Sequence, residues 1–410
     1  MTIQLEDIQK AERILQGVSL KTPTLKDPQL SLELGARVWV KAECLQRSGS
    51  FKVRGAYTKI CSLSPEEKSK GVVAPSAGNH AQGVALAAQL HGIHSTIVMP
   101  TFAPLTKVVA TKGYGAEVIL HGQSFDDAAA YVRQLQQERG LIPVHAFDDP
   151  LVIAGQGTLG LEILDALPDV DTIVVPIGGG GLISGVATAV KALHPKVRMV
   201  GVQATGCASV RPSLLAGHPI AVSAAQTIAD GIAVKRPGDL TLPIIREKVD
   251  QVVEVTDDEI ARGIVHCAQR LKLVVEGAGA AGIAALLAGK IDIRPQEKVC
   301  VVLCGGNIDG TLLSRVIEQV MAKQGRYMLL RLAIADRPGA LAPLISSVAE
   351  VGANIIDIFH LRAAWLAPLG KVGIELLLEV RDSLHGDGVV AHLQQSGYHV
   401  EREKQGYWPE

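Results

Sequence analysis

Aromatic residues and an excess of charge of either sign are scarce in this sequence of 410 residues. Phe, Trp and Tyr make up 3%, and 40 Lys and Arg residues against 41 Asp and Glu residues leave a net charge of −1. Proteins that bind nucleic acids present basic surfaces and stacking aromatic side chains, so no nucleic-acid partner is expected. No apolar run approaches the length of a membrane-spanning helix, about 18 residues, so no membrane partner is expected either.

Cysteine is also sparse, and the six residues are spread along the chain without a C-x-x-C pair. This spacing provides neither the usual zinc-binding pattern nor a disulfide framework, and it favours a reducing compartment. The first residues are charged throughout and lack the apolar core of a secretory signal. We therefore expect a cytoplasmic protein without a bound metal.

Glycine and apolar residues are abundant, at 42 residues and 48% of the chain. Short β-branched runs such as 172–176 and 298–303 alternate with longer Ala- and Leu-rich segments such as 79–90 and 181–193. Nearly continuous apolar strands that alternate with helices are typical of a parallel sheet covered on both faces. The pattern predicts a doubly wound α/β fold for residues 1–325.

The pattern changes after a short polar link at 321–326. The elements predicted beyond it are a strand at 327–335, a helix at 340–351, strands at 354–360 and 371–380, a helix at 384–395 and a strand at 398–401. The order βαββαβ is that of a ferredoxin-like fold. Residues 326–410 are therefore expected to form a separate domain.

Four consecutive glycines, Gly178–Gly181, stand between a predicted strand and a predicted helix. Glycine lets backbone N–H groups approach an anion, and a helix N-terminus is partially positive, so the segment predicts a phosphate-binding loop. A sharp structural turn is the alternative. No Gly-Lys-Ser/Thr follows, which excludes a Walker loop. The G-x-G-x-x-G matches at 155–160 and 277–282 lack the acidic residue that a dinucleotide site requires after the next strand.

Three other positions carry side chains suited to chemistry. Lys52 follows a Gly/Ser turn between apolar residues, where partial desolvation would lower its pKa and suit Schiff-base formation. The polar turn Ser76–His80 stands at a predicted helix start and could hold a carboxylate. Cys304 ends a predicted strand. Taken singly, each has an ordinary interpretation: a surface lysine, a helix N-cap and a small buried side chain.

Taken together, five motifs occur in the order seen in fold-type II pyridoxal-phosphate enzymes, and they most resemble the threonine dehydratase (threonine ammonia-lyase) family. The motifs are SGSFKVRGA (48–56), SAGNHAQG (76–83), GGGGL (178–182), EGAGA (276–280) and CGGN (304–307). The resemblance covers about residues 5–320 and implies two doubly wound subdomains, the smaller at about 45–150. Residues 327–403 resemble an ACT domain, a regulatory module that binds amino acids.

The resemblance implies a set of residues that bind pyridoxal phosphate. Lys52 would be the catalytic lysine that links to the cofactor, Phe51 would pack beside the cofactor ring, and Asn79 would contact its 3′-oxygen. Cys304 would face the pyridine nitrogen, where many relatives have serine. The 5′-phosphate would be held by Gly178, Gly179, Gly180, Gly181 and Leu182.

The resemblance also implies that Ser76, Asn79 and His80 bind the substrate carboxylate. Two departures from related enzymes bear on function. Serine racemase has a second acid/base serine where this chain has Ala77, which favours elimination over racemisation. Some relatives have a glutamate metal ligand where this chain has Gln203, so no divalent-cation site is carried over.

The activity implied is deamination of L-threonine to 2-oxobutanoate and ammonia, with L-serine as a second substrate, in a homodimer or homotetramer regulated by an amino acid bound to the ACT domain. A branched-chain amino acid is one candidate effector, and its identity stays open because this chain has Leu361 where relatives often have an acidic residue. Serine dehydratase or racemase activity is the alternative within the same chemistry. A non-catalytic amino-acid sensor on the same scaffold is an alternative of another class. The resemblance leaves open whether the activity serves isoleucine biosynthesis or threonine breakdown.

Overall fold

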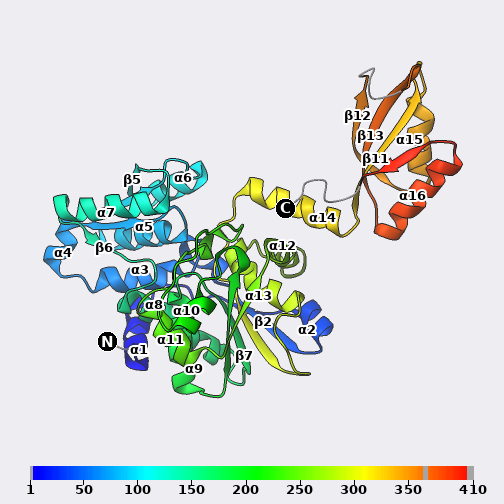
Figure 1. Cartoon of the computed structure of the whole chain (residues 1–410). Helices are drawn as coiled ribbons and strands as arrows, with labels where there is room; N and C mark the ends of the chain where they lie inside the picture. The colour runs from blue at the N-terminus through cyan, green and yellow to red at the C-terminus, as the bar shows by residue number, and fades with distance from the viewer. Residues whose placement is uncertain (1–2, 363–367, 404–410) are drawn as a thin grey trace. The chain divides into compact units, whose positions relative to one another are not determined.

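The computed structural model describes residues 3–362 and 368–403, and its chain divides into two compact units, Met1–Asp309 and Gly310–Glu410 (Figure 1). The division falls before helix α14 (Gly310–Lys323), whereas the sequence pattern places the boundary after residue 325. Helix α14 contacts the first strand of the second unit, which explains its place there. Among the described residues, no helix is both long and apolar enough to cross a membrane.

A six-stranded sheet forms the centre of the first unit, in the order β1-β2-β10-β7-β8-β9. Every neighbouring pair is parallel except β1 and β2. The strands are β1 (Thr24–Lys26), β2 (Arg37–Lys41), β7 (Thr172–Pro176), β8 (Arg198–Ala204), β9 (Gln251–Val255) and β10 (Lys298–Val302). The mostly parallel sheet confirms the predicted fold class, and the antiparallel edge strand β1 was not predicted.

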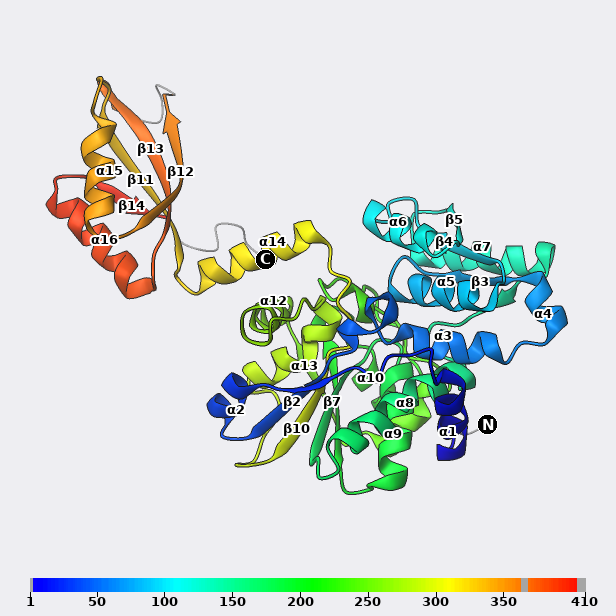
Figure 2. The ribbon, with the colours of Figure 1, turned by 180° about the vertical axis from the view of Figure 1, so that it is seen from behind.

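Helices lie on both faces of this sheet, as its continuously apolar strands require. Figures 1 and 2 show α8 and α9 on one side and α12 and α13 on the other. The helices of this large subdomain are α1 (Leu5–Leu15), α2 (Pro28–Leu34), α8 (Pro150–Ala166), α9 (Gly181–Leu193), α10 (Val210–Ala216), α11 (Thr241–Lys248), α12 (Asp257–His266) and α13 (Gly277–Leu287).

A second parallel sheet, in the order β5-β4-β3-β6, forms the small subdomain. Its elements are α3 (Lys52–Cys61), α4 (Pro65–Lys70), β3 (Val72–Pro75), α5 (Asn79–His91), β4 (Ser95–Met99), α6 (Leu105–Gly113), β5 (Glu117–Leu120), α7 (Phe125–Arg139) and β6 (Ile142–Pro143). Val72 and Ala74 pack in the core beside α3 and α5, whereas Val73 packs in the core beside α7. Because neighbouring strand residues point to opposite faces, both faces of β3 are buried.

The second unit contains a four-stranded antiparallel sheet in the order β12-β13-β11-β14. Its elements are β11 (Tyr327–Ala335), α15 (Leu341–Glu350), β12 (Asn354–Leu361), β13 (Lys371–Glu379), α16 (Ser383–Gln395) and β14 (Val400–Arg402). Along β11, alternate residues from Met328 to Ile334 are buried with residues of α15 and α16. This is the predicted βαββαβ order, and the last strand begins two residues later than the pattern indicated.

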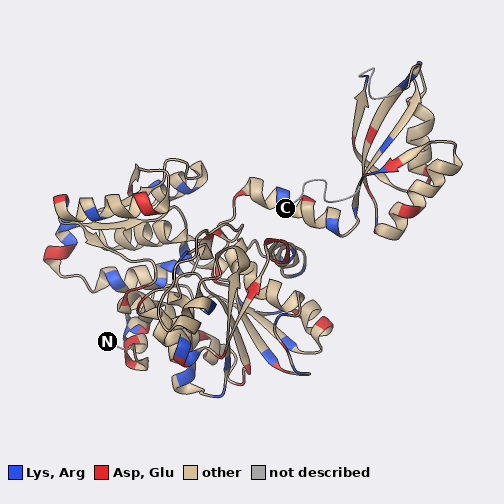
Figure 3. Ribbon diagram, viewed as in Figure 1, with Lys and Arg blue, Asp and Glu red and all other residues tan. Residues whose placement is uncertain are grey.

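Acidic and basic residues are interspersed along the helices and strands of both units (Figure 3). This distribution agrees with the balanced composition. No charge of one sign dominates the drawn ribbon.

Candidate active site

Lys52 is the first residue of α3 and is only partly exposed. Its Nζ donates a hydrogen bond to the carbonyl oxygen of Ala146 at 2.9 Å and lies 5.0 Å from the centre of the Phe51 ring. Burial lowers the pKa of Lys52 to about 8, although the nearby Cys304 and Glu276 oppose the shift. A lysine with such a pKa is partly uncharged near neutral pH, as a nucleophile or base must be.

Backbone hydrogen bonds hold Cys304 close to Lys52. The Phe51 N–H donates to the carbonyl oxygen of Cys304 at 3.1 Å, and Ser50 pairs with Gly305 in an isolated β-bridge. These contacts join the carboxyl end of β10 to the turn before Lys52. Burial raises the pKa of the Cys304 thiol well above its ordinary value, so the side chain stays neutral.

The four glycines form the turn between β7 and α9, and Gly180 adopts a left-handed conformation with φ of 98°. Two hydrogen bonds fix this turn. Thr241 Oγ1 and the Gly238 N–H donate to the Gly179 carbonyl oxygen at 2.7 and 3.1 Å. A Cβ added at Gly179 would lie 2.4 Å from the Phe147 ring, so only glycine fits there.

The N–H groups of Gly178–Gly181 have no hydrogen-bond acceptor among the described residues. They cluster at the N-terminus of the 13-residue helix α9, and Leu182 follows with its side chain buried. Unsatisfied donors at a helix N-terminus favour an anion such as phosphate. The observed loop therefore suits the phosphate group that the sequence predicts for it.

Asn79 opens helix α5, and both ends of its side-chain amide are bonded. Its Nδ2 donates to Glu276 Oε1 at 2.5 Å, and its Oδ1 accepts from Asn307 Nδ2 at 2.8 Å. Burial is the main cause that raises the pKa of Glu276, and the neighbouring Asp230 adds to it. The sequence analysis assigns Glu276 no role. The position of this single acidic residue at the start of the Gly/Ala-rich segment 276–280 could have indicated that it is functional.

Ser76 and His80 flank this helix start. Ser76 Oγ accepts hydrogen bonds from the N–H groups of Gly78 and Ala81, both at 3.2 Å. His80 Nε2 lies 2.8 Å from the Val144 carbonyl oxygen, and burial lowers the pKa of His80 to about 3. The neutral His80 therefore donates its N–H to Val144. The structure gives Ser76 and His80 these positioning contacts, and their predicted contact with a substrate carboxylate stays a prediction.

Gln203, which stands where some relatives have a glutamate metal ligand, bonds to the backbone. Its Oε1 accepts a hydrogen bond from the Val210 N–H at 2.9 Å, and the residue is fully buried. No cluster of three or more His, Cys, Asp or Glu residues suited to a metal occurs in residues 3–362 and 368–403.

A known protein family matches most of this chain. The family model described as "Pyridoxal-phosphate dependent enzyme" matches residues 16–305, which is most of the chain and lies within the first unit. The chain belongs to the pyridoxal-phosphate-dependent enzyme family.

Relatives in this family resemble the chain over most of its length. It is 48% identical over 398 residues to the L-threonine ammonia-lyase of Thermotoga maritima, covering 97% of this chain and 99% of the relative. It is 46% identical over 319 residues to the catabolic L-threonine dehydratase TdcB of Escherichia coli strain K12, covering 78% and 96%.

Solved structures of the same family share the fold. Threonine deaminase isoform 2 from Solanum lycopersicum has a TM-score of 0.73 and 39% identity, covering 77% of this chain and 86% of the tomato chain. Maize serine racemase has a TM-score of 0.74 and 37% identity, covering 79% and 99%. These matches confirm the fold-type II architecture.

The residues of the candidate active site fit pyridoxal phosphate, the cofactor of this family. The unsatisfied N–H groups of Gly178–Gly181 suit its phosphate, and the partly neutral amine of Lys52 suits its aldehyde. Lys52 and Asn79 belong to the small subdomain, whereas the glycine loop and Cys304 belong to the large one. The predicted cofactor-binding residues therefore come from both subdomains.

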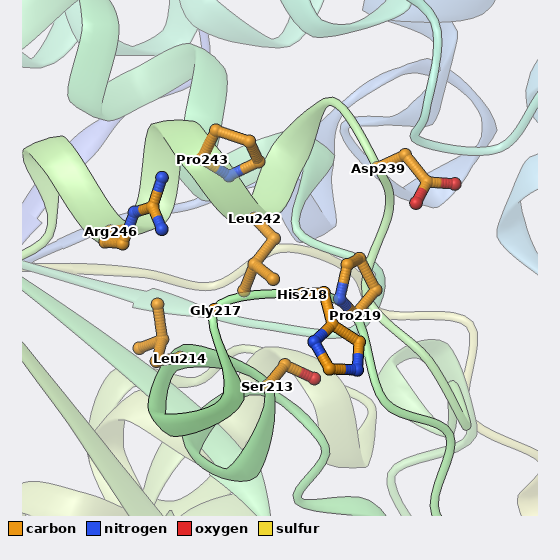
Figure 4. A pocket seen from close by; sticks show the side chains of 9 residues that line it. All are labelled: Ser213, Leu214, Gly217, His218, Pro219, Asp239, Leu242, Pro243 and Arg246. Carbon is orange, nitrogen blue, oxygen red and sulfur yellow. The ribbon is translucent and has the colours of Figure 1, made fainter.

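A surface pocket of the large subdomain lies apart from these residues. It is formed by α10, α11 and the loops beside them, with Arg246, Pro243 and Leu242 on one side and Ser213 and His218 on the other (Figure 4). None of the predicted site residues lines this pocket. The pocket therefore has no part in the candidate active site.

Proposed function

We propose that this pyridoxal-phosphate-dependent enzyme deaminates L-threonine to 2-oxobutanoate and ammonia, and that L-serine is a second substrate. The observation that carries the proposal is the 48% identity to an L-threonine ammonia-lyase over 97% of the chain, which includes most of the second unit. A site built for threonine differs from one for serine by a single methyl group, so selectivity between them is modest.

Pyridoxal phosphate, when bound, supplies an electron sink for the charge left when the α-proton of the substrate is removed. The amine of Lys52 takes that proton, for which its lowered pKa suits it. The turn at Ser76 and Asn79 binds the carboxylate. The β-hydroxyl then leaves as water by gaining one proton, which balances the proton that Lys52 removes. One water molecule then hydrolyses the resulting imine to ammonia and the oxo acid, so no net water is formed or consumed.

The neutral thiol of Cys304 favours elimination in this scheme. Burial raises its pKa, so it cannot hold a proton on the ring nitrogen as a charged acidic partner would. The electron sink is weaker for that reason, and expulsion of the β-leaving group is favoured over reactions that need a long-lived carbanion.

Racemisation of serine is the second candidate function, and the likeness to maize serine racemase favours it. Ala77 favours the lyase instead, because an alanine cannot deliver a proton to the opposite face of the substrate. Purified protein with pyridoxal phosphate is expected to form ammonia and 2-oxobutanoate in equal amounts from L-threonine, and pyruvate faster than D-serine from L-serine. D-serine formation faster than threonine deamination would contradict the assignment.

The second unit is proposed to be a regulatory ACT domain that binds isoleucine or valine. Its strand order and its position outside the matched family model support a role separate from the chemistry. Two such domains would pair within a homodimer or homotetramer. The enzyme would act in the cytoplasm, either in isoleucine biosynthesis or in threonine breakdown. Coupling between an effector site and an active site is typically worth about 1–3 kcal/mol.

Truncation after Gly325 tests this role. The shortened chain keeps α14 and all the candidate site residues, so it is expected to deaminate threonine while losing any response to isoleucine or valine. Threonine kinetics of full-length and truncated protein are compared across a titration of each amino acid. An identical response in both forms would exclude the second unit as the sensor, and an inactive but folded truncated form would give it a structural role.

A further inference from the structure

We propose that Lys107 and Asp230 are positioning residues for this reaction: their ion pair holds the small subdomain against the large one and so brings the two halves of the active site together. The inference rests on the proposed function only for its kinetic readout. Lys107 lies on α6 of the small subdomain, and Asp230 begins the short 3-10 helix η4 (Asp230–Ile232) of the large subdomain.

One partner of this ion pair is largely buried and the other is half exposed. The Lys107 Nζ bonds Asp230 Oδ2, and the Lys107 side chain is only 16% exposed, against 50% for Asp230. A second pair joins the same two subdomains, between Lys235 Nζ and Asp126 Oδ2 at 3.2 Å, with side chains 49% and 72% exposed. Exposed pairs contribute little because water screens them, so the Lys107–Asp230 pair is the stronger link.

Asp230 lies directly beside the candidate active site. A Cβ added at its neighbour Gly231 would be 3.1 Å from Glu276 Oε1 and 2.9 Å from the Cβ of Ala278. Glu276 in turn accepts the 2.5 Å hydrogen bond from Asn79, which comes from the small subdomain. The ion pair and this hydrogen bond therefore link the same two subdomains at adjoining points.

The electrostatics agree with this arrangement. The charge of Asp230 raises the pKa of Glu276, whereas Lys107 lowers it. With both partners present, these two effects oppose each other beside the buried carboxyl. Without Lys107, the half-exposed Asp230 would still act on Glu276 but without the opposing cation, and the ion pair between the subdomains would be lost.

The alignment of the subdomains matters because the predicted site is divided between them. Lys52 and Asn79 are carried by one, and the glycine loop and Cys304 by the other. Reacting groups must be held in a narrow range of geometry, so a loosened contact lowers the rate even when every catalytic group is present. Among the hydrogen bonds and ion pairs of residues 3–362 and 368–403, none joins Lys107 or Asp230 to a predicted site residue, so they act through this alignment.

A charge-exchange experiment tests the pair. Lys107→Asp and Asp230→Lys each place like charges together, and kcat/KM for L-threonine is expected to fall about fivefold or more in each. The double variant Lys107→Asp/Asp230→Lys restores an opposite-charge pair and is expected to recover most of that loss. Recovery of kcat/KM in the double variant shows that the two side chains interact directly. If each residue had only a general structural role, the double variant would have the lowest kcat/KM of the three.

Two further measurements keep the outcome clear. Lys235→Asp is the matched control, because it reverses a charge in the exposed pair between the same subdomains, and its kcat/KM is expected to be unchanged. Hydrogen–deuterium exchange of α6 in the full chain is expected to rise in both single variants and to fall again in the double. This readout needs no activity, so it separates failure of the pair from failure of the proposed reaction. Unchanged exchange in the singles, or a double no better than either, would overturn the proposal.

Discussion

Replacing Lys52 with alanine is expected to lower the release of ammonia from L-threonine by about a thousandfold or more. The variant loses the amine that takes the α-proton and that links to the cofactor. In the structure, burial lowers the pKa of the Lys52 amine to about 8, which suits this role. The glycine loop is untouched, so the variant is expected to bind pyridoxal phosphate, but more weakly.

Ammonia and 2-oxobutanoate are measured together with the visible absorption of the lysine-linked cofactor. Lys70→Ala serves as the control, because Lys70 lies on helix α4, which has no buried residue, and pairs with Glu66 on the surface. That variant should keep both the absorption and the activity of the unmodified protein. Ammonia release near the normal rate from Lys52→Ala would show that another group removes the proton.

Replacing Gly180 with alanine is expected to weaken binding of pyridoxal phosphate by about a hundredfold. Gly180 has φ of 98°, which side chains rarely adopt, and a Cβ there would lie 2.7 Å from Thr241 Oγ1 and 2.8 Å from Ile245 Cδ1. Strain of this kind costs about 1–3 kcal/mol. The loop is expected to relieve it by shifting, which turns its N–H groups away from the phosphate.

Gly92→Ala is the matched control for this variant. Gly92 also has a positive φ, of 66°, but a Cβ there would meet nothing within 4 Å. Both variants therefore carry a backbone cost, and only Gly180→Ala adds a steric clash at the loop. Fluorescence titration with pyridoxal phosphate and thermal melting are measured for both. Equal cofactor affinity in Gly180→Ala and Gly92→Ala would mean that the loop does not hold the phosphate.

The sequence by itself determined many of the helices and strands, and it located the glycine turn between β7 and α9. Strand β7 and helix α9 begin and end at the predicted residues, because apolar β-branched runs and Ala-rich segments record local periodicity. The four glycines indicate a turn between β7 and α9, because glycine can adopt backbone conformations that other residues disfavour. The order of strands and helices after residue 326 was also evident, because turn residues separate these elements.

The antiparallel edge strand β1 was missed because it has only three residues, Thr24–Lys26, too few for a periodic pattern. Its pairing with β2 is decided by the neighbouring strand and not by its own sequence. The two-residue strand β6 was missed for the same reason. Short strands of this kind depend on contacts that only the assembled sheet provides.

Only the tertiary structure decided which side chains meet. Glu276 bonds Asn79 although 197 residues separate them, and Lys107 pairs with Asp230 although 123 residues separate them. No local pattern encodes such pairs, because each partner is a common polar residue whose surroundings form only when the two subdomains pack. The same packing removes Lys52 and Glu276 from water and shifts their pKa values, whereas the sequence specifies only the residue types that burial acts upon.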